Sequence, residues 1–345
     1  MVAPVQQLTI ADLKQQAGAT PMDAAVHVQL QRRSPRTTRK GDPYLELEFA
    51  DTGSSFRLKA WSNHPQFGEV EQMRTGTCLA LQGSWTQNEY GIDSAGWSLR
   101  PLDDGEREQF LAGDPKTQAR QRQDWEYIRV TVGELRDPRL LALGERFLKE
   151  FGERFRRAAA ARRNHHARRG GLVEHVAQMM RSARALCTVY RDLNEDLLVA
   201  GVLFHDCGKL WENNYPETGF AQNHSIAGEM MGHIPLGIEL VNKLWRDLME
   251  DDASANWLTL EPASDHVRLH LLHLIASHHG EYEFGSPTLP RSPEAFTLHY
   301  VDNLDAKYEM VRMAYEAAPE LAPGLYERQF PLPANLVAPL PSFEG

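Results

Sequence analysis

The chain has 345 residues, 42% hydrophobic and 24% charged, a balance that predicts a soluble globular protein with room for two domains. Its formal net charge of -10 argues against retention on nucleic acid by bulk charge, although a local basic surface stays compatible with it. The three cysteines are scattered, which excludes a disulfide scaffold and a thiolate zinc site. The N-terminus does not resemble a signal peptide, and no apolar run reaches the roughly 20 residues that a membrane span needs. These features predict a cytoplasmic protein.

Residues 22 to about 102 have the pattern of short strands separated by turn residues. Stretches of alternating apolar and polar residues begin at Ala24, Tyr44, Phe56, Cys78 and Ser94. Five short strands in so short a segment favour a small barrel over a parallel sheet.

Basic and aromatic side chains gather in this strand-rich region. Arg57 and Lys59 alternate outward on the third predicted strand. The aromatic residues near them are Tyr44, Trp61, Trp85 and Tyr90. Such a combination suits single-stranded nucleic acid, because bases stack on aromatic rings and basic groups neutralise phosphates. The pattern is equally compatible with aromatic residues that fill the barrel core and charges that form a solvated face.

The composition changes at Asp103, and we place a linker over the polar residues 106–135. Helical periodicity dominates beyond it. The predicted helices are residues 138–160, 172–190, 196–211, 225–249, 265–279 and 293–315. We expect Pro235 to kink the helix at 225–249 near its start. A proline-rich tail follows, which we expect to wrap the domain or to fray.

Seven arginines stand between the first two of these helices or at their ends. They are Arg154, Arg156, Arg157, Arg162, Arg163, Arg168 and Arg169. A run of arginines is usually a solvated face. Because this run leads directly into a candidate metal site, we slightly favour a track that binds phosphates.

His205 and Asp206 stand together at the end of an apolar run. Burying both is costly unless they are paired or bind a metal. His175 lies in another apolar helix, and Asp302 lies among apolar residues of the last long helix. Alone, each has a simpler explanation as a hydrogen-bonded core residue or a helix cap. Together, two histidines and two aspartates on three helices predict a site for Mn, Fe, Co, Zn or Mg.

A second group of histidines predicts a second divalent ion. His233, His278 and His279 supply neutral nitrogen ligands near glycines at helix ends. Asp206 is placed to bridge the two ions. We favour manganese for both, although these nitrogen and oxygen ligands accept several metals.

This set of residues resembles the signature of HD-domain phosphohydrolases, which share an all-helical fold, and its extra histidines are similar to those of members that hold two or more metals. It looks most like the YhaM-type 3′–5′ exoribonucleases, which join an N-terminal OB-fold to an HD domain. The segments that carry the resemblance are His165-His-Ala-Arg-Arg-Gly-Gly-Leu-Val-Glu-His175, His205-Asp-Cys-Gly-Lys209, Gly232-His-Ile-Pro-Leu-Gly237, Ser277-His-His-Gly280 and Leu298-His-Tyr-Val-Asp-Asn-Leu-Asp-Ala-Lys307.

The resemblance implies a multidomain α and β protein. An OB-fold-like small β-barrel would occupy residues 1–105, an all-α HD domain residues 136–320 and the proline-rich tail residues 321–345. The implied activity is metal-dependent 3′–5′ hydrolysis of single-stranded RNA, or DNA, to 5′-mononucleotides by a metal-activated hydroxide.

The implied activity assigns roles to further residues. Lys209 would contact the scissile phosphate. Asp305 would orient a ligand histidine or accept the leaving-group proton, and His224 and His299 would support the ligands. The residues expected to bind nucleic acid are Arg57, Lys59, Arg168, Arg169 and His166.

Two other functions are compatible with the sequence. One is a phosphodiesterase or phosphohydrolase of small or cyclic nucleotides, with the barrel as a regulatory or oligomerisation module. The other is a nucleic-acid-binding protein with a degenerate HD site, against which the intact ligand set argues. The sequence leaves open the choice between RNA and DNA, the native metal and a homo-oligomeric state.

Overall fold

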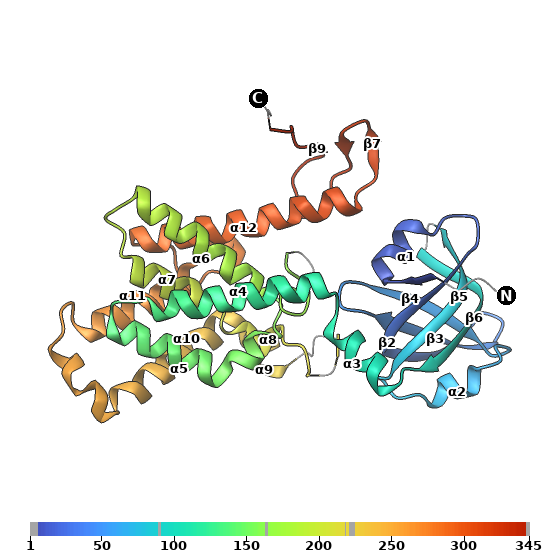
Figure 1. The fold of residues 1–345 in the computed structure, drawn as a ribbon, viewed down its shortest axis with the longest axis horizontal. Helices are drawn as coiled ribbons and strands as arrows, with labels where there is room; N and C mark the ends of the chain where they lie inside the picture. Colours follow the sequence, from blue (N-terminus) through green and yellow to red (C-terminus); the bar gives the residue numbers. More distant parts are fainter. Residues whose placement is uncertain (1–5, 89–90, 163–164, 218, 221–224, 343–345) are drawn as a thin grey trace. The chain divides into compact units, whose positions relative to one another are not determined.

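The computed structural model describes residues 6–88, 91–162, 165–217, 219–220 and 225–342. The chain divides into two compact units, which are considered separately (Figure 1). The first consists of Met1–Ala119 and Tyr215–Gln222 and is built on a β-sheet. The second consists of Arg120–Asn214 and Asn223–Gly345 and is mainly helical. The predicted order, a sheet-rich region followed by a helical domain, is confirmed.

The first unit is a sheet with short helices. Its elements are β1 (Gln6–Leu8), α1 (Ile10–Gln16), β2 (Met22–Thr37), β3 (Pro43–Ala50), β4 (Ser55–Trp61), α2 (Phe67–Gln72), β5 (Cys78–Asn88), β6 (Gly91–Pro101) and α3 (Asp104–Ala112). The strand order is β4-β3-β2-β5-β6 with antiparallel neighbours, and β1 pairs in parallel with β2. The five predicted strands correspond to β2 to β6. In β4, Phe56, Leu58 and Ala60 are buried and alternate with exposed residues, as a half-buried strand requires.

The sheet curls but does not close into the predicted barrel. In the described part of the chain, β4 and β6 are the ends of the paired strands and share no ladder. Side chains that follow β4 bridge to β6 instead. The Gln66 amide bonds the backbone N and O of Leu99 at 2.8 and 2.9 Å, and His64 Nε2 lies 3.1 Å from the Trp97 carbonyl oxygen. β4 ends at Trp61 and α2 follows, so backbone pairing stops before the sheet closes. The curled sheet is consistent with an OB-like fold.

The second unit is a bundle of helices with a small C-terminal sheet. Its elements are α4 (Pro115–Gly133), α5 (Pro138–Phe155), α6 (Gly171–Val189), α7 (Glu195–Phe204), α8 (Lys209–Glu212), α9 (Ile226–Met231), α10 (His233–Met249), the 3₁₀ helix η1 (Asp252–Thr259), α11 (Ser264–Ser277), the 3₁₀ helix η2 (Tyr282–Phe284), α12 (Pro293–Ala317), β7 (Glu320–Ala322), β8 (Leu325–Tyr326) and β9 (Leu336–Val337).

The helix α7 forms the centre of this bundle. All its residues from Leu197 to Phe204 are buried, and it packs against α5, α6, α11 and α12. A helix that is apolar all round belongs in a core, so α7 delivers the residues that follow it to the middle of the unit. It has only 10 residues, and no helix in the described ranges is both long and apolar enough to cross a membrane.

Two predicted helices are interrupted at the residues that later form the site. The helix expected at 196–211 ends at Phe204 and continues only after tight turns, in which the Cys207 N–H donates to the Phe204 carbonyl. The helix expected at 225–249 is divided at Gly232, whose φ is +72°. The kink predicted at Pro235 is wrong, because this residue lies in the first turn of α10, where a missing N–H breaks no helical bond.

The stretch predicted as a linker is helical. α4 carries Ile128 and Val132 into the core of the second unit, which begins at Arg120. Apolar residues are sparse in α4, which is why its sequence lacks a clear periodicity. The proline-rich tail forms the β7-β8-β9 sheet, and the Tyr315 hydroxyl at the end of α12 donates to the Val337 carbonyl.

Candidate metal centre

The turn after α7 places His205 and Asp206 inside the helical unit. Both side chains are buried, and His205 Nδ1 lies 2.8 Å from the carbonyl oxygen of Val202. A carbonyl oxygen can only accept a hydrogen bond, so Nδ1 carries the proton. The Nε2 atom of His205 is therefore left with a lone pair, which faces Asp206.

One oxygen of Asp206 faces the residues predicted for the first ion. Asp206 Oδ2 lies 3.3 Å from His205 Nε2 and 3.8 Å from His175 Nε2. Asp302 completes this group, with Oδ1 at 3.3 Å from His175 Nε2. The helices α6, α7 and α12 thus bring together the two histidines and two aspartates that the sequence predicted.

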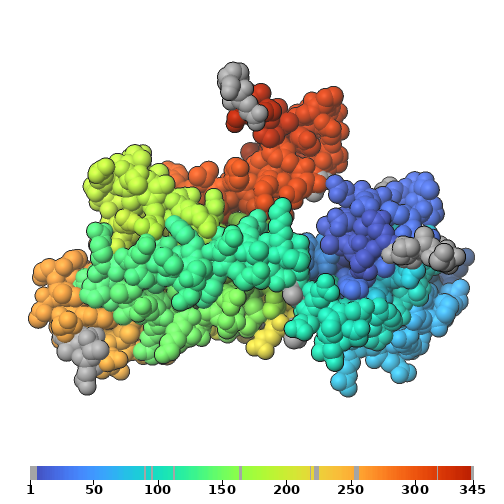
Figure 2. Space-filling view, in the orientation of Figure 1, coloured from blue at the N-terminus to red at the C-terminus, as the bar shows by residue number. Residues whose placement is uncertain are grey.

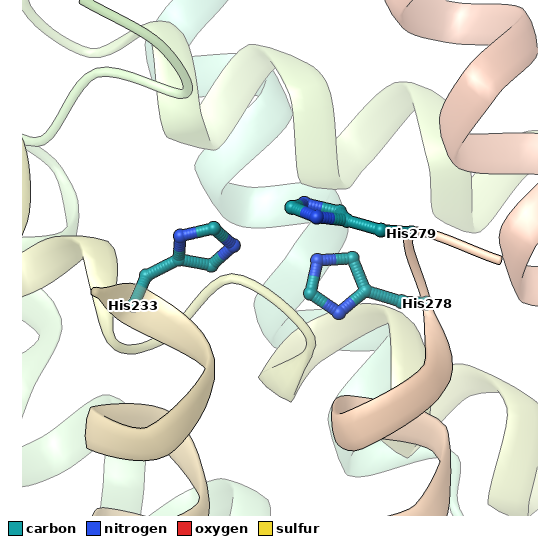
Figure 3. Close-up of side chains that lie close together, drawn as sticks. All are labelled: His233, His278 and His279. Carbon is teal, nitrogen blue, oxygen red and sulfur yellow. The ribbon is translucent and has the colours of Figure 1, made fainter. Parts of the chain in front are cut away.

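The other oxygen of Asp206 faces the histidines predicted for the second ion. Asp206 Oδ1 lies 3.5 Å from His233 Nε2 and 3.7 Å from His278 Nε2. One nitrogen from each of His233, His278 and His279 lies within 4.8 Å of the other two. Figure 3 shows these rings converging from the start of α10 and from the end of α11. Asp206 therefore stands between two nitrogen-rich groups, with one oxygen toward each.

Backbone carbonyls hold the two histidines that follow α11. His278 Nδ1 lies 2.8 Å from the Ile275 carbonyl, and His279 Nδ1 lies 2.6 Å from the Phe284 carbonyl. Both rings therefore carry the proton on Nδ1 and leave Nε2 available. The 3₁₀ helix η2 supplies the Phe284 carbonyl, which orients the ring of His279.

Carboxylates hold His233 and His175 in the same way. His233 Nδ1 lies 2.9 Å from Glu212, and His175 Nδ1 lies 2.7 Å from Asp305. Partners of this kind fix the tautomer, orient the ring and raise the basicity of Nε2 as a metal ligand. All five histidines of the two groups consequently present Nε2 to the centre.

Three buried atoms at the centre lack a hydrogen-bond partner within the described residues: Asp206 Oδ1, His233 Nε2 and His278 Nε2. A buried polar atom without a partner costs about 1–3 kcal/mol. A divalent cation would satisfy all three at once, since each offers a lone pair. Imidazole nitrogen and carboxylate oxygen are ligands for Mn, Fe, Co and Zn, so the donor set fits a metal.

The electrostatics of the centre suit metal ligands. Burial opposes the charged form of Asp206, but Lys209 and His205 outweigh it and hold the pKa of this carboxyl well below its usual range. Burial lowers the pKa of His278, which is therefore neutral at pH 7. Burial also opposes a charged His175, but Asp302 and Asp305 outweigh it and raise the pKa of His175 to about 10.

Metal uptake should release a proton. A cation that binds His175 Nε2 takes the place of the proton that the raised pKa, about 10, retains below that pH. Proton and metal therefore compete, and the affinity for Mn²⁺ should rise about tenfold per pH unit between pH 6.5 and 8.5. Calorimetric titration of chelator-treated protein in two buffers of different ionisation enthalpy would measure the released proton. An affinity that does not change with pH would contradict this coupling.

Comparison with known proteins identifies the family. The HD-domain model matches residues 172–307. The 3′–5′ exoribonuclease YhaM of Bacillus velezensis is 30% identical over 311 residues, covering 85% of this chain and 87% of that protein. The YhaM proteins of Oceanobacillus iheyensis and Bacillus subtilis are each 31% identical, covering 89% and 85% of this chain and 90% and 87% of theirs. This chain belongs to the YhaM family. The HD-domain match and these relatives indicate a hydrolase of phosphodiester bonds, as the sequence predicted.

Lys209 lies against the centre of this YhaM-family protein. Its Nζ is 2.6 Å from Asp206 Oδ2, and the side chain is buried. The ammonium group therefore neutralises the carboxylate that stands between the two histidine groups. The sequence placed Lys209 near the site but did not predict this ion pair.

Asp305 and His166 form one unit behind His175. The Oδ2 atom of Asp305 lies 2.7 Å from His175 Nδ1 and 3.0 Å from His166 Nε2. This contact is compatible with one of the two roles predicted for Asp305, that of orienting the ring of His175. His166 was predicted to contact nucleic acid, but it is 6% exposed and has a left-handed φ of +45°. Its ring lies among carboxylates, with Nε2 at Asp305 and Nδ1 at 3.7 Å from Glu174 and 3.9 Å from Glu309. The sequence did not suggest this buried position.

The arginines before α6 have partners within the helical unit. Arg168 bonds Glu174 and Glu309, two buried carboxylates. Arg154 and Arg162 donate to the backbone carbonyls of Leu210 and Glu212. These contacts brace the loops around the centre and differ from an exposed phosphate track. Arg169 is half-buried, and Arg163 lies outside the described residues.

In the first unit, Lys59 lies over two aromatic rings. Its Nζ is 5.9 Å from the ring centroid of Tyr44 and 5.7 Å from that of Trp61, and the two rings are 5.1 Å apart. Arg57 lies on the same face of β4, where its Nε is 3.8 Å from Glu48. Of the other two aromatic residues considered, Trp85 is a core residue, and Tyr90 lies outside the described residues.

The sequence missed two carboxylates that support the centre. Glu212 orients His233, and Glu174 is held by Arg168, Gln121 and Arg120 behind the ligand helices. The sequence held one signal for these two residues, the position of Glu174 next to His175. His299 Nδ1 lies 3.0 Å from the His278 carbonyl, next to the site, and His224 lies outside the described residues.

Proposed function

We propose that this chain is a metal-dependent 3′–5′ exoribonuclease that hydrolyses single-stranded RNA to 5′-mononucleotides. The observation that carries the proposal is the position of Asp206, with Oδ1 toward His233 and His278 and Oδ2 toward His175 and His205. It supports a site for two divalent ions, of which manganese is our choice. The names of the relatives, 3′–5′ exoribonuclease YhaM, support RNA as the substrate and the direction of hydrolysis.

Each ligand residue has a definite task in this proposal. Divalent ions bound at the centre supply Lewis-acid chemistry, which acidifies water and offsets charge on phosphate oxygens. Asp206 holds the two ligand groups at a fixed separation, and Lys209 limits the negative charge there by its 2.6 Å contact. Asp305 keeps His175 in the tautomer that presents Nε2. The burial of these groups excludes bulk water and strengthens each interaction.

The first unit supplies a grip on single-stranded RNA in this proposal. Tyr44 and Trp61 offer ring faces for bases, and Lys59, whose Nζ lies over both rings, offers a charge for a phosphate. An exonuclease needs such a grip, because a lone pocket would bind a long strand no better than a dinucleotide. Arg57 and Arg169 remain candidates for further phosphate contacts.

Replacing Trp61 with alanine should weaken RNA binding. Stacking of one base on an aromatic side chain contributes about 1–3 kcal/mol, so the affinity for a 20-nucleotide strand should fall about 5- to 150-fold. Fluorescence anisotropy in chelator would measure this without turnover. Phe330→Ala is the matched control, because Phe330 is an exposed aromatic in the tail. Equal affinities in the two variants would remove the stacking role.

A single-strand time course tests the function itself. RNA labelled at its 5′ end is incubated with the protein in Mn²⁺, and a second sample contains EDTA. The expected result is a ladder that shortens from the 3′ end in Mn²⁺ only, with 5′-mononucleotides as the released products. An RNA whose 3′ end is covered by a stable duplex serves as the matched substrate and should be degraded slowly.

Other results would redirect the proposal. RNA that stays intact in Mn²⁺, while cyclic or short dinucleotides are hydrolysed, would assign a small-nucleotide phosphodiesterase. RNA that is bound but never cleaved with any divalent ion would assign a binding protein. Products cut internally would replace exonuclease with endonuclease action.

A further inference from the structure

The outward face of α12 is apolar. Between Pro293 and Tyr308, every residue is described, and the exposed side chains are those of Pro293, Phe296, Tyr300, Leu304, Lys307 and Tyr308. We call Phe296, Tyr300, Leu304 and Tyr308 the α12 stripe. Its members follow one another at intervals of four residues and are 49% to 70% exposed. The opposite face of the same helix carries Asp302 and Asp305 of the metal centre.

The α12 stripe borders a hollow at its N-terminal end. This cavity of about 360 Å³ is lined by Phe296 and Tyr300 and, across from them, by Leu186, Tyr190 and Asp192 from the end of α6 and the loop after it. Figure 1 shows α6 and α12 adjacent in the helical unit, and both reach the surface in Figure 2. The hollow and the stripe form one continuous apolar surface.

This surface is at the upper end of the apolar area that a monomer exposes in one patch. The exposed parts of its aromatic residues Phe296, Tyr300, Tyr308 and Tyr190 amount to roughly 500 Å² when an aromatic side chain counts for about 150–250 Å². The largest apolar patch of a typical monomer is about 300–600 Å². A stable interface buries about 800 Å² per partner, of which the centre is apolar and the rim polar. The surface therefore matches the apolar centre of a protein interface.

The charges on this surface favour protein over RNA. Lys307 is the one basic side chain among the exposed residues of α12 from Pro293 to Tyr308, and Asp192 lies at the edge of the hollow. Nucleic acid needs several basic groups to neutralise its phosphates. The exposed Arg191 beside Asp192 adds a second basic group at the edge of the hollow. An apolar ridge with these few charges at its edges suits a protein partner with the same features better than a strand of phosphates.

The geometry of the stripe is self-complementary. A row of residues at intervals of four is the ridge that packs against an identical ridge in the commonest class of helix crossing, with an angle near -50°. The hollow lies at one end of the ridge and Tyr308 at the other. A two-fold axis between them would place Tyr308 of each copy at the hollow of the other, and Lys307 near the other copy's Asp192.

We propose that the α12 stripe and its hollow form the interface of a symmetric dimer of this chain. Each copy contributes α12 and the end of α6. The interface then packs against the outer face of the helix whose inner face supplies Asp302 and Asp305. The partner is a second copy because one continuous surface provides both the protruding side chains and the cavity that receives them.

Sedimentation equilibrium of the full chain over a range of concentrations tests the dimer. The expected mass is twice 39.1 kDa for the wild type. Tyr300→Glu and Leu304→Lys should each raise the dissociation constant by about 30-fold or more, as substitutions at the centre of an interface do. Leu269→Glu is the matched control, because Leu269 is a half-exposed apolar residue on α11 outside the stripe, and it should remain dimeric.

A charge exchange tests the arrangement within the dimer. Lys307→Glu should weaken the dimer, because it places a negative charge near the other copy's Asp192. Lys307→Glu combined with Asp192→Lys should restore the dimer, because the two positions then carry opposite charges again. Circular dichroism and bound manganese should stay at wild-type levels in every variant, which separates loss of the interface from loss of folding.

Three results would overturn the dimer. A wild-type protein that is monomeric at every concentration would do so. A dimer that tolerates both stripe substitutions with folding intact would place the interface elsewhere. A monomer in which Tyr300→Glu weakens RNA binding, while Leu269→Glu does not, would assign the stripe to nucleic acid.

Discussion

Asp206→Asn will lower kcat for RNA hydrolysis by about 10³-fold or more. Asparagine keeps the shape of aspartate but loses the negative charge that two groups of Nε2 atoms share, and its amide adds a donor where only acceptors fit. Bound manganese should fall together with the activity. Steady-state kinetics on a short single strand and elemental analysis of the purified protein would measure the two losses.

The matched control is Asp247→Asn on α10. Asp247 is paired with Lys243 at the surface of the same unit and lies outside the metal centre. This variant should keep wild-type manganese and activity. If Asp206→Asn retained both ions and most of its activity, the bridging position of Asp206 would be without consequence, and the proposed centre would have to be moved.

A methyl group at position 208 will disrupt the second histidine group. An ideal Cβ on Gly208 would lie 1.9 Å from the His233 carbonyl oxygen and 2.8 Å from the Gly237 nitrogen, and both are backbone atoms. The first turn of α10 must therefore move, and His233 moves with it. Overpacking of this kind costs about 1–3 kcal/mol, which corresponds to a fall in melting temperature of about 2–12 °C for a unit of this size.

Gly133→Ala provides the control for this substitution. Nothing lies within 4 Å of a Cβ at Gly133, and its φ is not in the left-handed range. That variant should match or slightly exceed the stability of the wild type, since alanine favours a helix over glycine. Thermal unfolding and manganese stoichiometry together decide the outcome. A Gly208→Ala protein with unchanged melting temperature and full metal content would show that the contact with α10 is dispensable.

The cluster at the candidate metal centre could be predicted because the chemistry of its residues conflicts with their surroundings. His175, His205 and Asp302 stand in apolar stretches, where an imidazole or a carboxylate needs a partner. The bridging position of Asp206 followed from the presence of two histidine groups around a single adjacent pair. These inferences required residue type and approximate position only, which a sequence contains.

The contacts of the charged residues could not be predicted in the same way. Arg168 stands in a run of basic residues, but one of its partners, Glu309, follows 141 residues later. Lys209 was expected at a phosphate, and in the structure it bonds Asp206, three residues before it. The pairing of Arg168 with Glu309 depends on the packing of helices that are distant in the sequence, and local sequence patterns do not encode that packing.

The breaks in the two predicted helices could not be predicted either. Periodicity continues through His205 to Gly208 and through Gly232, so the sequence favoured unbroken helices there. Gly208 packs closely against the first turn of α10, where a side chain has no room. The sheet was similarly predicted strand by strand, whereas its failure to close depends on where β4 ends.

The wide separation of the ligands has a consequence for synthesis of the protein. His175 and Asp302 are 127 residues apart, and α12 supplies both Asp302 and Asp305 after every other ligand has been translated. A nascent chain therefore lacks a complete centre until α12 has emerged and packed against α6 and α7. Translation that stops earlier, for example on a broken message, yields a polypeptide with histidines but without this aspartate pair.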